Sequence, residues 1–340
     1  MRINGKIMGM RNEQVENILM WYKTNKRDLI FRRTKDPYWI WVSEVMAQQT
    51  QIATMLPYYS RWMEKYPTIA DLAKAEIQDV YALWHGLGYY NRATNLVKGA
   101  QYIVMHYGNH YPTTYQQWLQ VNGVGPYIAA AIASICFDEK VASIDGNVNR
   151  VVARFNALDL IQGSAAFAKS VRNQVDNWLI DGRSSQLNQA LMEMGALVCT
   201  KANPKCECCP LSKWCKGKED ATVYPKKKAK KVNPVESYLV GFIVKDGKVA
   251  IEMPPYNDGL LSGYYRLPTK LAKLNKNYPI VKHIFSHKTW LLQYDPAFKL
   301  DEKTTEWIDI QQLINQKKLI VAHIKLLNKL HLLMAYLDKQ

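Results

Sequence analysis

The stretch VNGVGPYIAAAIASI (residues 121–135) decides how the N-terminal part of this 340-residue chain folds. Two glycines bracket Val124, and Pro126 opens a run of small and apolar residues that is typical of a buried helix. Glycine permits a tight turn, and the first backbone N–H groups of the following helix have no intrahelical partners. The stretch therefore predicts a turn between helices that also suits an anion such as a phosphate. A purely structural role for Gly123 and Gly125 is the alternative.

Helical patterns extend on both sides of this turn, from about residue 12 to 218. We expect Asn12 to cap a helix. The buried face of that helix would be formed by Val15, Ile18, Leu19 and Tyr22. Asp36 and Pro37 form a second start signal, a capping side chain followed by proline at the first helical position, before YWIWVSEVMAQQ (38–49). This part of the chain is therefore predicted to be all-α.

A lysine-rich stretch, TVYPKKKAKKVNP (222–234), separates two parts of the chain. Its lysines and two prolines indicate an exposed linker, which we place at residues 222–236. Residues 1–221 would then form the first domain, and residues 237–340 a second one.

The second domain combines strand and helix patterns. The segments ESYLVGFIV (236–244) and VAIEM (249–253) flank Asp246 and Gly247, a dipeptide that predicts a β-hairpin. Near the end of the chain, AHIKLLNKLHLLMAYL (322–337) has a helical pattern. We therefore expect a small α+β domain.

The charge balance favours a polyanionic partner. Lysine and arginine number 45 against 29 aspartates and glutamates, which gives a formal net charge of +16 and a pI near 9.4. Nucleic acid is the commonest partner of such a protein, and an anionic membrane surface is the second. No apolar run reaches the roughly 18 residues that a membrane span needs, and the start of the chain lacks the apolar core of a secretion signal. We expect a cytoplasmic monomer that binds nucleic acid and has no membrane partner.

Two acidic residues lie where acid–base chemistry is plausible. Glu44 lies within the apolar segment WIWVSEVMA (39–47), where removal from water would raise its pKa into the range of a general acid. Asp145 precedes the helix predicted for SIDGNVNRV (143–151). Taken singly, a solvated glutamate and a helix-capping aspartate are the ordinary interpretations. Together they would form the carboxylate pair that cleaves glycosidic bonds, one protonated and one ionised.

Polar and aromatic side chains on two other segments suit contacts with bases. Gln48 and Gln49 follow the apolar segment of Glu44, and their amides carry both the donors and the acceptors that a base edge requires. Leu87 and Tyr89 lie beside two glycines in WHGLGYYNRATNLVKGA (84–100). Such side chains can enter a base stack and help to extrude a nucleotide, or they can belong to the core.

Five of the six cysteines lie in CTKANPKCECCPLSKWC (199–215). Disulfides, a zinc ion and an iron–sulfur cluster are the three interpretations of such a group. Clustered cysteines in a reducing compartment more often bind metal than form disulfides. Four thiolates suit either tetrahedral Zn²⁺ or a [4Fe–4S] cluster, so thiol chemistry alone leaves both open.

Six motifs occur here in the order found in the helix-hairpin-helix DNA glycosylases, and the resemblance covers most of residues 12–218. They are DPYWIWVSEVMAQQTQ, GLGYYNRATNL, VNGVGPY, SIDGNVNRV, NQALMEMGALVCT and the cysteine pattern C-x6-C-x2-C-x5-C. Within that superfamily, SEVMAQQT combined with SIDGNVNRV resembles the adenine DNA glycosylase family of MutY type, which removes adenine mispaired with 8-oxoguanine.

The resemblance implies roles for individual residues. Glu44 would protonate the flipped adenine and later activate water, while Asp145 would stabilise the sugar cation, supported by Asn147 and Tyr127. Endonuclease III-like lyases have a lysine nucleophile at the position of Tyr127, so base removal without strand cleavage is implied. The positions expected to contact DNA are Gln48, Gln49, Leu87, Tyr89, Gly123 and Gly125.

By the same resemblance, the cysteine group would hold a [4Fe–4S] cluster. Its ligands would be Cys199, Cys206, Cys209 and Cys215, leaving Cys208 as a spare thiol. The second domain resembles a Nudix fold that lacks the acidic metal ligands of a Nudix hydrolase. It would read 8-oxoguanine through Phe285, Ser286 and His287.

The sequence thus predicts a two-domain DNA repair enzyme that removes adenine opposite 8-oxoguanine or guanine in duplex DNA. Three alternatives remain: an endonuclease III-like glycosylase and lyase acting on oxidised pyrimidines, a noncatalytic metal-containing DNA-binding protein, and a hydrolase of the nucleotide pool.

Overall fold

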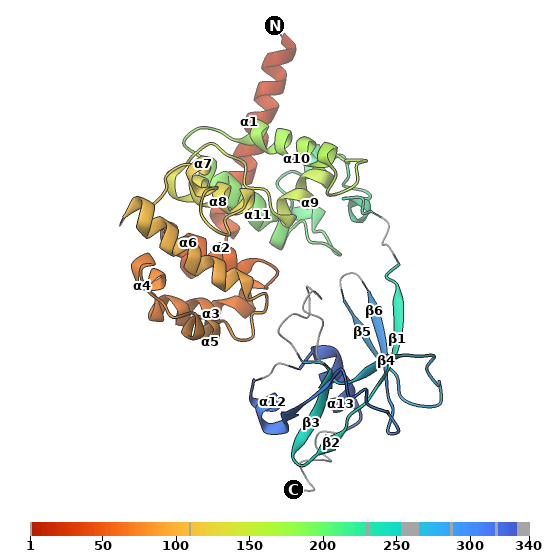
Figure 1. Cartoon of the computed structure of the whole chain (residues 1–340). Coiled ribbons are helices and arrows are strands. Elements are labelled where there is room, and N and C mark those ends of the chain that lie inside the picture. Colours follow the sequence, from red (N-terminus) through yellow and green to blue (C-terminus); the bar gives the residue numbers. More distant parts are fainter. Residues whose placement is uncertain are drawn as a thin grey trace. The chain divides into compact units, whose positions relative to one another are not determined.

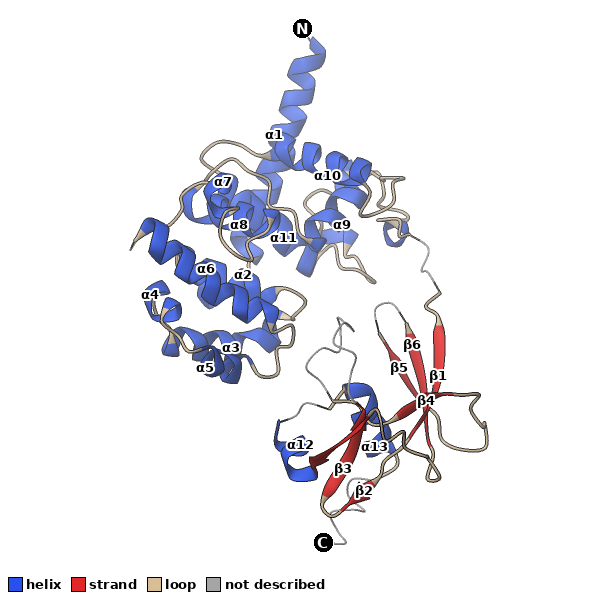
Figure 2. Ribbon diagram, viewed as in Figure 1, coloured by secondary structure: helices blue, strands red, loops and turns tan. Residues whose placement is uncertain are grey.

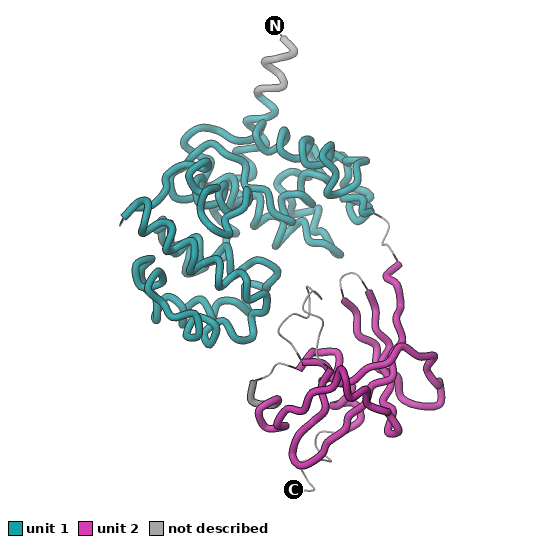
Figure 3. Tube along the Cα trace, in the orientation of Figure 1, with its two compact units in different colours: residues 1–228 teal, residues 229–340 magenta. Residues whose placement is uncertain are grey.

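A computed structural model describes residues 2–108, 110–228, 232–252, 265–285, 288–316 and 319–331, without the side chains of residues 2–8 and 314–316. The chain divides into two compact units, Met1–Lys228 and Ala229–Gln340 (Figure 3). The division falls inside the lysine-rich stretch 222–234.

Unit 1 is helical (Figures 1 and 2). Its helices are α1 (Arg2–Asn25), α2 (Pro37–Ala47), α3 (Ile52–Lys65), α4 (Ile69–Ala73), α5 (Ile77–Trp84), α6 (Asn91–Tyr107), α7 (Tyr115–Trp118), α8 (Pro126–Phe137), α9 (Gly146–Phe155), α10 (Ala165–Trp178) and α11 (Ser184–Leu197). Short 3-10 turns are η1 (Ile30–Arg32), η2 (Cys206–Cys208), η3 (Ser212–Trp214) and η4 (Ala221–Val223). The predicted all-α character is confirmed for the described residues of this unit.

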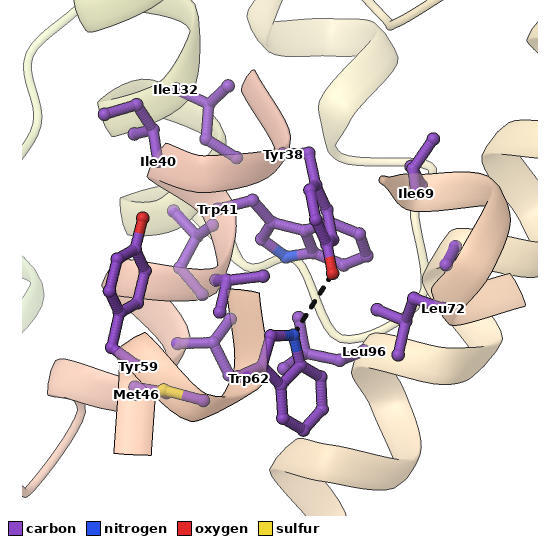
Figure 4. Close-up of a cluster of buried hydrophobic side chains, with 14 of the residues drawn as sticks. Tyr38, Ile40, Trp41, Met46, Tyr59, Trp62, Ile69, Leu72, Leu96 and Ile132 are labelled. Atoms are coloured by element: carbon purple, nitrogen blue, oxygen red, sulfur yellow. Dashed lines mark hydrogen bonds between the residues drawn. The ribbon is translucent and has the colours of Figure 1, made fainter. Parts of the chain in front are cut away.

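Two hydrophobic cores stabilise unit 1. The first lies among α2, α3, α5, α6 and α8 and contains several large aromatic side chains (Figure 4). There the indole N–H of Trp62 donates to the hydroxyl of Tyr38 at 3.2 Å, and that hydroxyl donates to the carbonyl of Tyr66 at 2.8 Å. The second core lies among α1, α9, α10 and α11. Helix α11 packs against both α8 and α9, so it joins the two cores.

The helix start signals read from the sequence have different outcomes. Asp36 caps α2 by accepting from the backbone N–H of Tyr38 at 2.8 Å, and Pro37 occupies the first turn, as predicted. The predicted face of α1 is also buried: Val15, Ile18, Leu19 and Tyr22 are all less than 10% exposed. The cap at Asn12 is wrong, because α1 already begins at Arg2. Residues 2–11 contain no proline, and each residue added to an existing helix gains a backbone hydrogen bond.

The described residues of unit 2 form two sheets and two helices. The first sheet has the order β4-β1-β6-β5, in which β1 (Val235–Val240) runs parallel to β6 (Thr289–Tyr294) and antiparallel to β4 (Thr269–Leu271). Strand β5 (Val281–Ile284) pairs antiparallel with β6. The second, antiparallel sheet has the order β2-β3-β7, formed by β2 (Val244–Lys245), β3 (Lys248–Glu252) and β7 (Thr305–Asp309). Helices α12 (Ile310–Gln316) and α13 (Val321–Lys329) complete the predicted α+β domain.

The hairpin predicted at Asp246 and Gly247 is confirmed, but its first strand is shorter than expected. Both residues have positive φ angles, 51° and 75°, and Lys245 pairs with Lys248 across the two-residue turn. The segment 236–244 is not one strand. It divides at Gly241, where an added Cβ would lie 2.8 Å from the Phe298 ring, so its two halves join different sheets.

Two further predictions concern helices. The helix expected over residues 322–337 is present as α13, and the part of it after residue 331 lies outside the described residues. None of the helices in the described part of the chain is both long and apolar enough to cross a bilayer.

Candidate active site

A cleft of about 1040 Å³ opens in unit 1 between residues of both cores. Its walls come from η1, α2, the turn that follows α2, and the beginnings of α8 and α9, with α11 on one side. The predicted site residues that line it are Glu44, Gln48, Gln49, Tyr89, Tyr127, Asp145 and Asn147. The fold therefore brings the two predicted carboxylates and their neighbours, which are far apart in the sequence, to one cavity.

Glu44 has a carboxyl group whose pKa is strongly raised by the cleft. It lies on α2 with partial access to the cavity, and the hydroxyl of Tyr127, from the first turn of α8, donates to its Oε2. Burial raises the pKa of Glu44 to about 7, and the negative charge of Asp145 acts in the same direction. The Tyr127 hydrogen bond and the positive charge of Arg32 oppose this shift. Glu44 can therefore hold a proton near neutral pH and release it to a bound molecule.

Asp145 is the N-cap of α9, so the ordinary interpretation of this residue is correct. Its Oδ1 accepts from the Val148 backbone N–H at 2.8 Å, and its Oδ2 accepts from the Asn147 amide at 2.7 Å. Burial raises the pKa of Asp145, while these hydrogen bonds lower it. Capping and a role in the cleft are compatible, because the cap fixes the carboxylate at the cavity wall.

An arginine pair on α9 connects this cap to the cysteine segment. Arg150 donates to Asn147 Oδ1 at 2.8 Å and to the carbonyl of Cys199 at 2.8 Å. Arg154, one turn further on and only 2% exposed, donates to Cys199 Sγ at 3.4 Å and to the carbonyl of Thr200 at 2.6 Å. Sequence reasoning missed both residues. The available signal was their position three and seven residues after Asn147 on a predicted helix, which places all three side chains on one face.

A second group missed from the sequence lines another part of the cleft. Glu193 on α11 accepts from Arg27 at 2.7 Å and from Arg32 at 2.7 Å, and its side chain is fully buried. Burial would raise the pKa of Glu193, but the hydrogen bonds from Arg27 and Arg32 outweigh that effect and lower it to about 2. The signal was an acidic residue within the apolar segment LMEMGAL (191–197). This group fixes η1 against α11 and places a permanent positive charge near Glu44.

Four of the cysteine thiols line one small pocket, together with Arg154. They are Cys199, Cys206, Cys209 and Cys215, the predicted ligand set. Burial raises the pKa of Cys209 to about 12. Cys208 is exposed and does not line the pocket, and Cys136 packs beside the first core. No group of three or more His, Cys, Asp or Glu side chains in the described residues is arranged to ligate a single metal ion.

Three other predicted residues of unit 1, Leu87, Gly123 and Gly125, do not line the cleft. Leu87 is buried in the first core, whereas Tyr89, which does line the cleft, is 64% exposed. Gly123 has a φ of 77°, and a Cβ there would lie 2.5 Å from the Asn95 Cβ, so this position requires glycine for structural reasons. Gly125 is the N-cap of α8. The anion-binding role of this turn stays a prediction.

Only part of the predicted reading segment can be placed. Phe285 packs edge-on against His283 and Trp290, with ring centroids 4.5 and 4.9 Å apart. Ser286 and His287 lie outside the described residues.

The chain is similar to known proteins. Residues 42–174, which include Glu44, Tyr127 and Asp145, match the HhH-GPD superfamily of base excision DNA repair proteins. This match covers less than half of the chain.

Individual proteins resemble the chain to different extents. An adenine DNA glycosylase of Rattus norvegicus is 44% identical over 209 residues, which cover 59% of this chain and 40% of that protein. An adenine DNA glycosylase of Buchnera aphidicola subsp. Baizongia pistaciae is 28% identical over 87% of this chain and 90% of its own length. The solved structure of a thermostable thymine-DNA glycosylase is 29% identical and covers 62% of this chain and 96% of its own, with a TM-score of 0.56.

The match to the first of these relatives thus spans less than half of its length. The residues matched to the superfamily end before α11 and the cysteine segment. Arg150 connects Asn147 to both, because it also donates to the carbonyls of Gly195 and Cys199.

Gly195 on α11 provides a test of the packing that supports Asp145. A Cβ at this position would lie 2.5 Å from the Asn147 Cβ and 3.1 Å from its Cα, so α9 would have to move. We expect Gly195→Ala to lower the free energy of unfolding by about 1–3 kcal/mol, the usual cost of overpacking. Urea denaturation measures this change.

Gly9 on α1 is the matched control, because nothing lies within 4 Å of a Cβ added there. Gly9→Ala should raise the free energy of unfolding by up to about 1 kcal/mol through helix propensity. If Gly195→Ala is as stable as the unaltered protein, the close packing of α11 on Asn147 is not a constraint.

Proposed function

We propose that the chain is a monofunctional DNA glycosylase that hydrolyses the N-glycosidic bond of adenine opposite 8-oxoguanine or guanine in duplex DNA. The observation that carries this proposal is the carboxyl group of Glu44, whose pKa is about 7, in the same cleft as the capped carboxylate of Asp145. Two carboxyl groups in different environments are what cleavage of a glycosidic bond requires. The adenine DNA glycosylases among the relatives support the choice of base.

The reaction follows from the protonation states of the two groups. Protonated Glu44 donates its proton to a ring nitrogen of adenine while the C1′–N9 bond breaks and its electron pair goes to the base. The positive charge left on the sugar faces ionised Asp145, whose orientation is fixed by its bonds to Val148 and Asn147. Glu44, now a carboxylate, takes a proton from the water that attacks C1′, which restores its initial state.

Tyr127 supports a glycosylase without lyase activity. Its hydroxyl contacts Glu44, and burial raises the pKa of this phenol well above its ordinary value. A lyase would require an amine that forms a Schiff base with the sugar, and a phenol cannot do so. We therefore assign Tyr127 to holding the Glu44 carboxyl in place.

Extrusion of the base would rely on the cleft rim. Gln48, Gln49 and Tyr89 lie there, and the exposed ring of Tyr89 is suited to enter the space that the adenine leaves. The turn at Gly123 and Gly125 would hold a backbone phosphate with the free N–H groups of α8. The net charge of +16 would add sequence-independent attraction for DNA.

The four thiols of the cysteine pocket would ligate a [4Fe–4S] cluster, as the resemblance implies. They surround one cavity, and four thiolates satisfy such a cluster. When bound, such a cluster would crosslink four thiolates and so hold segment 199–215 in its folded form. The carbonyl of Cys199 would then stay in place as an acceptor for Arg150.

Unit 2 is proposed as a Nudix-like domain that recognises the opposite 8-oxoguanine. Its mixed parallel and antiparallel sheet and its helices are compatible with that fold. The Phe285, Ser286 and His287 segment would make the recognition contacts.

The function is tested with two duplexes, one carrying adenine opposite 8-oxoguanine and one carrying thymine glycol opposite adenine. We expect breaks only in the adenine strand and only after alkali treatment, because base removal leaves an intact abasic site. Glu44→Gln should lower the single-turnover rate by about 10²- to 10⁴-fold while DNA binding is retained. Exposed Glu64 on α3 is the control, and Glu64→Gln should be as active as the unaltered protein.

Other outcomes distinguish the alternatives. Direct breaks at thymine glycol would indicate a lyase, and equal behaviour of Glu44→Gln and the unaltered protein would indicate a noncatalytic DNA-binding protein. If unit 2 recognises the opposite base, His287→Ala should lower the ratio of the adenine release rate opposite 8-oxoguanine to the rate opposite guanine. Turnover of oxidised dGTP with Mg²⁺ would assign unit 2 to nucleotide hydrolysis instead.

The pKa of Glu44 also predicts how the reaction depends on pH. The carboxyl must be protonated to act, so the single-turnover rate should fall as the pH rises through about 7. Because this pKa is raised above its ordinary value of 4.5, the folded protein binds the proton more tightly than the unfolded chain does. Stability from this group is therefore present below pH 4.5 and is lost as the pH rises through about 7.

Denaturation curves from pH 4 to 8 would compare the unaltered protein with Glu44→Gln, which cannot titrate. The difference between the two in unfolding free energy should change across this window. A constant difference, or an adenine release rate that rises through pH 7, contradicts the assignment of Glu44 as the acid.

The cofactor is tested by metal analysis of the purified protein. We expect iron and acid-labile sulfide, and both should be lost in Cys209→Ser, because Cys209 lines the pocket. Cys208→Ser is the matched control: this thiol is exposed and outside the pocket, so the variant should keep its iron. Zinc without iron in the purified protein would rule out the cluster.

A further inference from the structure

Two turns at the rim of the cleft have the same unusual backbone conformation. Gln49 follows α2 with a φ of 57°, and Tyr89 follows α5 with a φ of 50°. The left-handed region is unfavourable for residues that carry a Cβ, and such residues persist only where their surroundings hold them. Both side chains line the cleft and would face DNA under the proposed function.

One guanidinium group holds both turns. Nη1 of Arg92, at the start of α6, donates to the carbonyls of Val45, Met46 and Gln48 at 3.0, 3.1 and 2.6 Å. Nη2 of the same residue donates to the carbonyls of Leu87 and Gly88 at 3.0 and 3.1 Å. Five backbone carbonyls from two separate turns therefore converge on one cation.

The carbonyls come from positions that local structure leaves without a full set of partners. Those of Val45 and Met46 belong to the last turn of α2, where carbonyls lack the usual i+4 N–H partner; Val45 accepts a longer bond, 3.3 Å, from the backbone N–H of Gln48. The guanidinium also stacks over the buried ring of Trp84, with 5.1 Å between Cζ and the ring centroid. It therefore has little freedom to move away from the two turns.

We propose that Arg92 is a positioning residue that locks the turns of Gln49 and Tyr89 into one rigid unit, so that both side chains enter the base stack together during extrusion of the target nucleotide. This inference rests on the proposed function. A planar guanidinium is required, because its two terminal nitrogens face different turns, whereas a lysine ammonium presents all its N–H groups from a single atom. Arg92 itself acts only through the residues that it holds.

The test measures base extrusion separately from chemistry. 2-Aminopurine replaces the target adenine opposite 8-oxoguanine, and its fluorescence rises when the base leaves the stack. The full-length Glu44→Gln protein is compared with Glu44→Gln carrying Arg92→Lys. We expect the extrusion equilibrium to fall roughly tenfold, which corresponds to about 1.4 kcal/mol. With Glu44 intact, Arg92→Lys should lower the single-turnover rate of adenine release by the same factor.

Arg61 on α3 gives the matched control. Its guanidinium stacks on the Tyr58 ring at 4.7 Å, it is exposed, and it lies outside the cleft, so Arg61→Lys should leave extrusion and rate unchanged. If Arg92→Lys melts below the assay temperature, Arg92→Gln replaces it, because its amide can bond only one of the turns. In a protein that already carries Tyr89→Ala, Arg92→Lys should lower base extrusion less than it does alone, because the arginine would act through the Tyr89 side chain.

The outcomes separate this inference from the function on which it rests. A slower rate with unchanged extrusion, or full additivity of the Arg92 and Tyr89 effects, overturns the positioning role. If the unaltered protein neither extrudes the base nor releases adenine, the proposed function itself fails.

Discussion

Removal of the Glu44 carboxyl from water is the constraint on which the site depends. On a solvated helix this group would ionise well below neutral pH and could not act as an acid. In the folded chain, α2 places it against the Tyr127 hydroxyl from α8 and near the negative charge of Asp145 from α9. Burial and like charge therefore favour the protonated form, while one phenolic hydrogen bond fixes the direction of the group.

The two carboxyl groups differ because their supports differ. Glu44 has one hydrogen-bond donor from a side chain, whereas Asp145 caps a helix and accepts from a backbone N–H and an amide. Helix α11 sets both environments: its Glu193 binds the arginines that line the cleft, and its Gly195 lets Asn147 approach closely. Arg150 continues the same hydrogen-bonded chain to Cys199, so the cysteine segment and the cleft share one framework.

Much of the local structure could be predicted because it depends on neighbours in the sequence. Asp36 and Pro37 start α2, Pro126 starts α8, and the Asp246 and Gly247 turn forms its hairpin, since each signal needs only a few adjacent residues. The prediction of one strand over residues 236–244 failed because a distant residue decides the outcome: the segment divides between two sheets at Gly241, beside Phe298. The cap predicted at Asn12 failed for a local reason, because the helix continues back to Arg2.

The sequence by itself determined the helical character of unit 1, the α+β character of unit 2, the presence of two carboxylates with distinct neighbours, and the group of cysteines. Only the tertiary structure decided that Leu87 belongs to the core while Tyr89 faces the cleft, and that Arg92, Arg150 and Glu193 join elements far apart in the chain. Periodicity and capping are local properties that short stretches of sequence carry. The partner of a buried charged group, by contrast, depends on how separate helices pack, and no short stretch contains that information.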